Sequence, residues 1–282
     1  MSLTGGLAAR TAARELARER RRQTVRHVLA RSVLYALAAG AAVLCAAPFL
    51  WSLWTAVQGP SREARARLLL RSTPFPAFVA HTVLVGALVT VATLVLALPA
   101  AYALTRRRWG GTAGRWIAVL ALVPSVLLAV PLSWTADELG LGRSVWTLVL
   151  VQPTVTVPVG VLLFGGFLRA VRVDIEEQAL VDGYSRLAAF LRIVVPQLRP
   201  AIAAVAVLAF TLAAGDFVYA QALAAGEPTV AAGIPARLAH GGAPLWRSLQ
   251  FGVVLVAVPL AAAADLVLGR LIATSSAAAD RT

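Results

Sequence analysis

Long apolar stretches alternate with short arginine-rich stretches along most of the chain. A membrane-spanning helix needs about 20 mostly apolar residues, and six stretches meet that length. The expected spans are residues 32–57, 79–105, 116–136, 146–168, 200–224 and 248–271. Lipid offers backbone groups no hydrogen-bond partners, so each span must satisfy them internally as a helix. The pattern therefore predicts an all-α, polytopic membrane protein with six transmembrane helices.

Composition supports a membrane environment. Of the 282 residues, 59% are hydrophobic and 14% are charged, with a mean hydropathy of +0.78, whereas soluble domains carry about 25% charged residues. The net charge of +13 raises the possibility of nucleic-acid binding. However, the basic residues cluster between the apolar runs, as topology signals do, so no nucleic-acid partner is expected. The single Cys45 excludes an internal disulfide and gives no support to a metal site.

The distribution of arginine predicts the orientation. With six spans and a cytoplasmic N-terminus, the internal segments carry 19 of the 26 basic residues, so both termini are expected in the cytoplasm. Residues 1–31 form a basic arm, read either as an amphipathic helix on the membrane surface or as a disordered anchor. Residues 32–273 form the transmembrane domain and residues 274–282 a cytoplasmic tail. One loop, with Arg62, Arg65, Arg67 and Arg71, goes against the rule; a short external helix is expected there.

The longest polar loop, residues 169–199, lies between the fourth and fifth spans. It reads as two short helices joined by a glycine turn. Asp174 is expected to cap the first helix, with Glu177 completing a capping box. Gly183 stands where a left-handed C-terminal cap is needed, Ser185 can cap the second helix, and Pro196 is expected to end it. Such a loop is either a compact knob for a cytoplasmic partner or an amphipathic connector lying on the lipid.

The spacing within this loop favours the knob. The chain reads Glu177-Gln178-Ala179, then Gly183, Ile193 and Val195-Pro196. It resembles the permease subunits of binding-protein-dependent ABC importers, whose signature is Glu-Ala-Ala, three residues, Gly, nine residues, Ile, any residue and Leu-Pro. Gln178 and Val195 are conservative departures. On this resemblance, the expected fold is that of a type I ABC importer permease.

Other stretches resemble the maltose-type, or carbohydrate, branch of that family. They are Phe49-Leu50-Trp51, Ala100-Ala101-Tyr102-Ala103-Leu104, and Pro124 with Pro131. Two stretches depart from the branch: Ala214-Gly215-Asp216-Phe217, where it often has Trp-Asn-Asp-Phe, and His81-Thr82, where it often has Asn-Ser. The departures leave the importer resemblance intact and weaken any inference about the exact sugar.

The resemblance implies a set of partners. They are a second, homologous permease, two cytoplasmic ATPase subunits and an extracytoplasmic solute-binding protein, in a bacterial inner (plasma) membrane. The chain contains no lysine and no phosphate-binding glycine loop, so it is expected to be a transporter subunit and not an enzyme. No cofactor of its own is expected, because ATP would bind to the partner ATPases. The residues expected to couple the permease to the ATPase are Glu176, Glu177, Ala179, Leu180, Asp182, Gly183, Ile193 and Pro196. Ala179 and Leu180 are read as the small apolar tip of the knob.

Polar residues inside the spans are candidates for the path of the solute, since they are costly in lipid and usually face a cavity or a partner. Asp216 is the first candidate, and its alternative is an interhelical hydrogen bond that fixes span five. Trp134 could stack on a sugar ring or anchor the membrane interface. The full set is Asp216, Tyr219, Gln221, Gln152, Thr154, Thr156 and Trp134.

Four functions are weighed at this point. The first is a permease for a sugar, and the second is the same machine taking up a polyol, a glycerophosphodiester or another small polar solute. The third is a purely structural membrane subunit, which gives no reason for the spacing from Glu177 to Pro196. The fourth is an ion-coupled secondary transporter, which predicts inverted repeats and buried carboxylates. No clear repeat is visible, and Asp216 and Asp265 are the only acidic residues inside the spans.

Overall fold

The computed structural model describes residues 31–58, 61–106, 110–238 and 243–279. The chain divides into two parts, Met1–Gln58 and Gly59–Thr282. The basic arm expected at residues 1–31 lies outside the described residues except for Arg31, which begins a helix.

Every regular element among the described residues is a helix. The first part contains the helix Arg31–Val57. The second part contains α2 Arg62–Ser72, α3 Phe75–Arg106, α4 Gly110–Leu122, α5 Ser125–Glu138, α6 Val145–Val151, α7 Pro153–Ala170, α8 Val173–Val181, α9 Arg186–Ala189, the π-helix η1 Phe190–Val194, α10 Val195–Gln197, α11 Arg199–Gly215, α12 Phe217–Leu223, α13 Val230–Leu238 and α14 Ala243–Ala279.

The all-α membrane prediction is confirmed, with a different division into helices. Within the part of the chain that the structure describes, four helical segments are long and apolar enough to cross a membrane: Arg31–Val57, Phe75–Arg106, Val145–Ala170 and Trp246–Leu266. Two bent helix pairs raise the number to six if each pair is one span. The last helix runs on to Ala279, beyond the end expected at residue 271.

The third span was expected to be continuous over residues 116–136, and that expectation is wrong. It consists of α4 and α5, which meet at an angle of 90°. The break falls at Val123–Pro124, where Pro124 adopts an extended conformation (φ −62°, ψ 134°). Proline lacks an N–H and pushes the residue before it out of the helical region, so the helix stops here and restarts at Ser125.

The fifth span is interrupted as well, whereas the fourth continues as one span, Val145–Ala170, in which Gln152 keeps helical dihedral angles between α6 and α7. Gln152 ends α6, and Pro153 opens α7 at the position where a missing N–H costs least. Asp216, with ψ of 109°, separates α11 from α12. A second bend, of 77°, separates the helical segment Arg186–Gln197 from α11. Long apolar stretches therefore predicted where the chain crosses the membrane but not where each crossing breaks.

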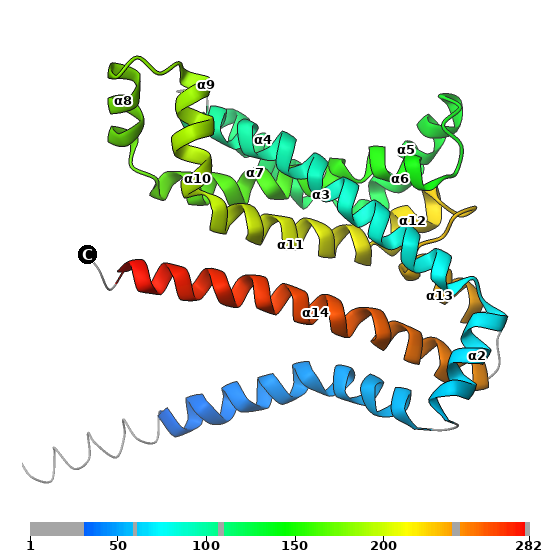
Figure 1. Ribbon diagram of the computed structural model, residues 1–282. Coiled ribbons are helices and arrows are strands. Elements are labelled where there is room, and N and C mark those ends of the chain that lie inside the picture. The colour runs from blue at the N-terminus through cyan, green and yellow to red at the C-terminus, as the bar shows by residue number, and fades with distance from the viewer. Residues whose placement is uncertain (1–30, 59–60, 107–109, 239–242, 280–282) are drawn as a thin grey trace, which may run out of the picture. The chain divides into compact units, whose positions relative to one another are not determined.

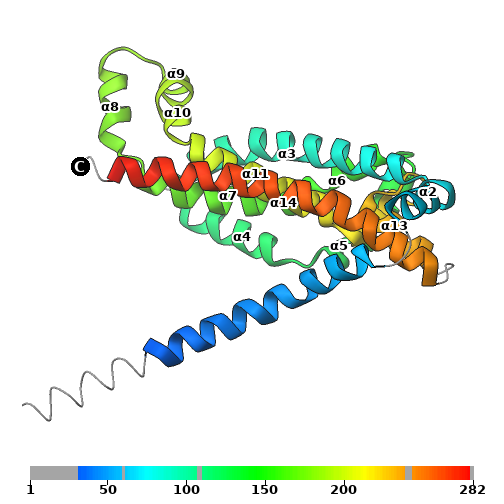
Figure 2. The ribbon, with the colours of Figure 1, turned by 60° about the horizontal axis from the view of Figure 1, so that its bottom comes forward.

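Helices α3, α7 and α11 pack against one another in the second part of the chain. Figures 1 and 2 show α8 and α9 at one end of these helices, and α2 and α13 at the opposite end. The buried side chains that join α3 to α7 near mid-length include Thr93 and Thr156, whose hydroxyl oxygens lie 2.6 Å apart. Gly160, one turn further along α7, faces Ala97 of α3. The small residue and the buried hydrogen bond together allow a close helix–helix approach.

We expect Gly160→Ala to destabilise the protein and Gly166→Ala, in the same helix, to leave stability unchanged or slightly raised. A Cβ at position 160 would lie 2.9 Å from the Ala97 Cβ, which is fixed to the α3 backbone, whereas a Cβ at position 166 meets nothing within 4 Å. Overpacking of this kind typically costs about 1–3 kcal/mol. Thermal unfolding in detergent measures the difference, and equal stability of the two variants would contradict the close approach.

The loop that went against the charge rule forms α2, so the short helix expected there is confirmed. The guanidinium carbon of Arg65 lies 5.4 Å from the centroid of the Phe251 ring in α14, and Arg65 is buried. Arg67 pairs with Glu63 one turn away. Two of the four arginines are thus engaged in packing or pairing.

Candidate functional site

Most of the residues singled out by the sequence lie in two regions. One is the hairpin α8 to α10, and the other is a cavity with polar residues in its wall, between spans three, four and five. In the hairpin, α8 ends in a Schellman motif. The N–H of Tyr184 donates to the carbonyl of Ala179 (3.0 Å), and the N–H of Gly183 donates to that of Leu180 (3.2 Å). Gly183 has φ of +88°. The expected left-handed glycine cap is therefore confirmed.

Of the other caps expected in this loop, the one at Ser185 is present and the one at Asp174 is not. The Ser185 hydroxyl accepts a hydrogen bond from the N–H of Ala188 (3.2 Å), as expected. The capping box of Asp174 and Glu177 is wrong, because α8 begins two residues earlier than expected, at Val173 after Arg172, and Asp174 pairs with that arginine instead.

Pro196 does not end the second helix. The chain passes through the π-helical turns of η1, whose wider i to i+5 hydrogen bonding brings the N–H of Val195 to the carbonyl of Phe190. Pro196 needs no N–H partner, and the wider turn relieves the clash of its ring with the preceding turn. The helix continues to Gln197 and breaks at Leu198, before Pro200 in the first turn of α11.

Ala179 and Glu176, two of the expected coupling residues, face inward. Ala179 was expected in an exposed apolar tip but is buried, and its neighbour Leu180 is half-buried. Glu176 is 7% exposed. Ile193 and Pro196 are also half-buried, whereas Glu177, Asp182 and Gly183 are exposed.

The outer surface of the hairpin is formed by residues that were not predicted from the sequence to take part in coupling. Val181 is 87% exposed at the turn, and Leu187 and Tyr184 are exposed beside it. A nine-residue helix with polar residues on several sides gives only a weak indication of its exposed face. The signal that could have identified these residues is their place next to Gly183, at the point of the hairpin.

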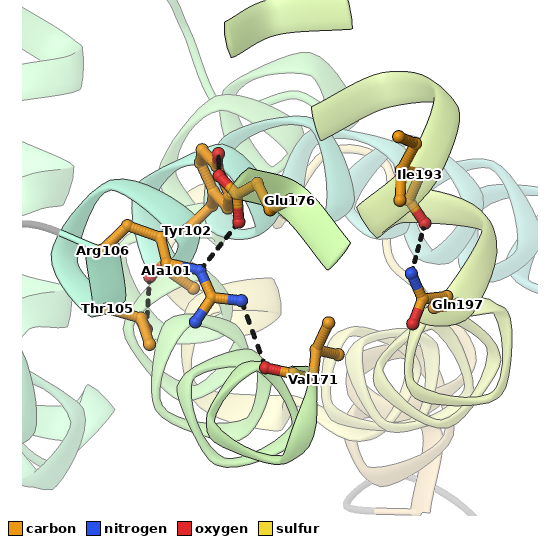
Figure 3. A network of polar contacts seen from close by, with 8 residues as sticks. All are labelled: Ala101, Tyr102, Thr105, Arg106, Val171, Glu176, Ile193 and Gln197. Atoms are coloured by element: carbon orange, nitrogen blue, oxygen red, sulfur yellow. Dashed lines mark hydrogen bonds and ion pairs between the residues drawn. The ribbon is translucent and has the colours of Figure 1, made fainter. Parts of the chain in front are cut away.

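The buried Glu176 carboxylate joins the hairpin to α3 (Figure 3). It accepts hydrogen bonds from the Tyr102 hydroxyl and from Nε of Arg106, the latter at 3.0 Å. Arg106 also donates from Nη2 to the carbonyl of Val171, at the joint between α7 and α8 (3.3 Å). The Tyr102 ring packs on Phe190 of the second hairpin helix, with centroids 4.5 Å apart. One small network therefore connects both helices of the hairpin to the end of α3.

A cavity of about 480 Å³ lies between residues of spans three, four and five. Ser125 stands just after the break of span three, Gln152 at the junction of α6 and α7, and Asp216 at the break of span five. Apolar side chains complete the wall, with polar contributions from Ser125, Gln152, Thr156, Thr211 and Asp216. The sequence reading identified Gln152, Thr156 and Asp216, and it missed Ser125 and Thr211.

Gln152 connects the junction of α6 and α7 to the break of span five. Its Nε2 donates to the carbonyl of Ala213 (3.0 Å). In a continuous helix that carbonyl would accept from residue 217, so the break at Asp216 leaves it without its usual partner. Gln152 is 1% exposed, and its Oε1 has no hydrogen-bond partner among the residues that the structure describes. A buried acceptor with no partner is costly unless a ligand or water reaches it.

Asp216 caps the short helix that follows it. Its Oδ1 accepts a hydrogen bond from the N–H of Tyr219 (3.1 Å), so the bond across helices comes from Gln152 and not from Asp216. Tyr219 is fully buried, and its hydroxyl lies 3.4 Å from that of Thr154. Gln221 and Trp134 are exposed and are not part of the cavity wall.

Comparison with known proteins identifies the family. Residues 93–274 match the family described as the inner membrane component of binding-protein-dependent transport systems. The chain belongs to this family. The matched region contains the hairpin and the residues that line the cavity.

Individual relatives are also named as permease proteins of transport systems. The chain is 33% identical to an ABC transporter permease protein of Streptomyces antibioticus over 162 residues, which cover 57% of this chain and 71% of the relative. It is 28% identical to the trehalose/maltose transport system permease protein MalG of Thermococcus litoralis over 252 residues, 83% of this chain and 90% of the relative. It is 26% identical to the trehalose transport system permease protein SugB of Mycobacterium tuberculosis over 199 residues, covering 69% and 73%.

Family membership makes the chain a multi-pass permease subunit of an ABC transporter and not an enzyme. Permeases of this family work with a solute-binding protein and an ATPase.

Proposed function

We propose that this permease forms half of the translocation path for a sugar and receives the conformational change of an ATPase through the hairpin α8 to α10. The observation that carries the proposal is the exposed, Schellman-capped turn at Gly183, spaced as in the permease signature. In this assignment the hairpin is a coupling element and the cavity is part of the path. ATP binds to the partner ATPase subunits, and this chain needs no cofactor of its own.

The exposed surface of the hairpin suits a groove on a partner. Val181 and Leu187 offer apolar side chains, and Glu177 and Asp182 offer carboxylates beside them. Exposed apolar side chains next to charged ones are typical of a docking surface. Glu176 and Ala179, which are buried, then stabilise the hairpin, and Glu176 also joins it to α3 through Tyr102 and Arg106.

The expected assembly contains this chain, a second permease, two ATPase subunits and an extracytoplasmic binding protein, embedded in lipid. The hairpin and both termini lie on the cytoplasmic side, where the arginine distribution places them. ATP would close the ATPase dimer, and the permease pair would move between inward-open and outward-open states, a two-state equilibrium biased by ligand.

The cavity supports a path for a neutral polar solute. Interrupted helices place backbone N–H and C=O groups at the level of the break, and transporter binding sites are commonly built there. The wall of this cavity offers an amide oxygen, hydroxyls and one carboxylate, which match the many donors of a sugar. Irregular backbone at membrane depth is stable only where it lines such a cavity or is buried in protein.

The sugar assignment rests on the relatives named for trehalose and maltose. A polyol or a glycerophosphodiester would use the same hydrogen-bonding groups and stays the second candidate. Family membership gives no support to the ion-coupled alternative, because binding-protein-dependent systems are driven by ATP.

Purification of the intact complex tests the proposal. In mild detergent the tagged chain should bring down an ATPase and a second permease. The reconstituted complex, with its binding protein, should take up labelled trehalose or maltose only with ATP, and glycerol tests the polyol alternative. Recovery of the chain with no ATPase, or uptake driven by an ion gradient alone, would overturn the assignment.

We expect Asp216→Ala to slow uptake strongly and Asp216→Asn to retain most of it. Alanine removes both the cap of α12 and the acceptor in the cavity, and an N-cap loss alone costs about 1 kcal/mol. Asparagine can still accept from the N–H of Tyr219 and from a sugar hydroxyl. Transport kinetics measure the effect; if Asp216→Ala leaves uptake unchanged, Asp216 does not belong to the path.

A further inference from the structure

Helix α3 has a continuous helical backbone and packs against both α7 and α11. It runs for 32 residues, from Phe75 to Arg106, which is a length of about 48 Å at 1.5 Å per residue. Of the nearby spans, α4 and α5 meet at a break at Pro124 and α11 ends at Asp216, whereas Val145–Ala170 continues as one span through Gln152. A displacement at one end of a broken helix can be absorbed at the break, whereas a continuous helix packed on both sides moves as a unit.

The hairpin end of α3 is tied to the hairpin by charged and polar groups (Figure 3). The side chains of Arg106 and Glu176 form an ion pair with exposures of only 14% and 9%. Tyr102 donates to the same carboxylate, and Arg106 reaches the carbonyl of Val171. Because both charges are buried, neither can separate from the other and remain stable in place. The hairpin and α3 therefore have to move together.

The opposite end of α3 is tied to the segment that joins α12 to α13. The N–H of Val230 donates to the buried hydroxyl of Thr82 (2.8 Å), and Nδ1 of His81 lies 3.3 Å from the carbonyl of Pro228. The same segment holds the start of α6, because Oε2 of Glu227 accepts a hydrogen bond from the N–H of Val145 (3.0 Å). Residues 224–230 thus link α3 to the start of the span Val145–Ala170 and to α12, which lies beyond the break at Asp216.

From these contacts we infer that α3 is the rod that carries the movement of the docking hairpin to residues 224–230 at the opposite end of the permease. Tyr102, Arg106 and Glu176 form its tie at the hairpin, and Thr82 forms its tie at the other end. Of the other routes between the two ends, α11 is interrupted at Asp216, whereas the span Val145–Ala170 also reaches residues 224–230, through the bond between Val145 and Glu227. Thr82→Val leaves that bond intact and therefore tests α3 by itself. The inference rests on the proposed docking of the ATPase to the hairpin.

A cysteine in the distant segment reports the movement. Ala225 is exposed there, so Ala225→Cys is introduced with Cys45→Ser in the full complex, reconstituted in nanodiscs that leave both faces accessible. The rate of labelling by a polar maleimide is measured without nucleotide and after trapping with ATP and vanadate. In the otherwise unchanged complex, trapping should change the rate.

Four variants test the rod and two serve as matched controls. Tyr102→Phe, Arg106→Met and Glu176→Gln weaken the tie at the hairpin, and Thr82→Val weakens the distant tie. The controls are Thr105→Val and Thr90→Val, since those hydroxyls donate to Ala101 and Gly86 within α3 itself. The nucleotide-dependent change in rate should be lost in Arg106→Met, Glu176→Gln and Thr82→Val, be reduced in Tyr102→Phe and persist in both controls.

The outcomes separate the rod from the docking assignment. If no ATPase is recovered with the parent complex, the proposed function fails. If the ATPase is recovered and the nucleotide-dependent change persists in Thr82→Val and Arg106→Met, the rod is wrong while docking stands. Thr82→Val keeps the test decisive even if a variant at the buried ion pair fails to fold, because it removes one hydroxyl at a site of matching shape, far from the hairpin.

Discussion

Gly183→Pro is expected to abolish ATP-driven uptake while the protein still inserts into the membrane. The Schellman motif requires φ of +88° at this position, and proline is restricted to about −65°. Proline also removes the N–H that donates to the carbonyl of Leu180. The turn that sets the angle between α8 and α9 would therefore have to re-form, and Val181 and Leu187 would no longer be presented together.

Gly183→Asn is the control for this prediction. Asparagine tolerates the left-handed region better than other non-glycine residues and keeps its N–H, at a cost of about 1 kcal/mol. It should retain most of the uptake and most of the stimulation of ATP hydrolysis by the loaded binding protein. The measurements are the yield in the membrane fraction, the ATPase recovered on purification and the uptake rate. Coupled transport at the normal rate by Gly183→Pro would contradict the assignment of the hairpin as the element that couples the permease to the ATPase.

The membrane-spanning character could be predicted from the sequence because it depends on local quantities. A run of apolar side chains is costly in water and stable in lipid wherever its neighbours lie. The caps at Gly183 and Ser185 are local in the same way, since each satisfies backbone groups within a few residues. Both were predicted and both are present.

The inward direction of Glu176 could not be predicted in the same way. Its burial depends on Tyr102 and Arg106, more than 60 residues earlier in the chain, and a lone carboxylate in a polar loop is usually exposed. The break at Asp216 has a similar origin. Helices that are apolar all round give no sign of which turn will open, and the opening at Asp216 is stabilised by Gln152 from another helix.

Gln152→Leu is expected to lower both the stability of the protein and its uptake activity. Leucine fills a similar volume but donates nothing, so the Ala213 carbonyl would be left unpaired at a site where Gln152 is 1% exposed. A buried polar group left without its partner costs roughly 1–3 kcal/mol. Spans four and five would also lose the bond that connects them, and the cavity would lose the Oε1 acceptor. Thermal unfolding in detergent and uptake by the reconstituted complex measure the two effects.

Gln221→Leu provides the comparison, because Gln221 is an exposed glutamine five residues after Asp216. It should change stability by less than about 0.5 kcal/mol, as surface substitutions usually do. Gln152→Ala separates the two roles of the side chain further, since it leaves space in which water can reach the Ala213 carbonyl. If water restores the lost bond, Gln152→Ala should be less destabilised than its volume loss implies, yet uptake should stay low because the amide is absent from the wall. If Gln152→Leu, Gln221→Leu and the parent protein have equal stability and equal uptake, the prediction is wrong. The bond between Gln152 and Ala213 would then contribute neither to the stability of the fold nor to transport.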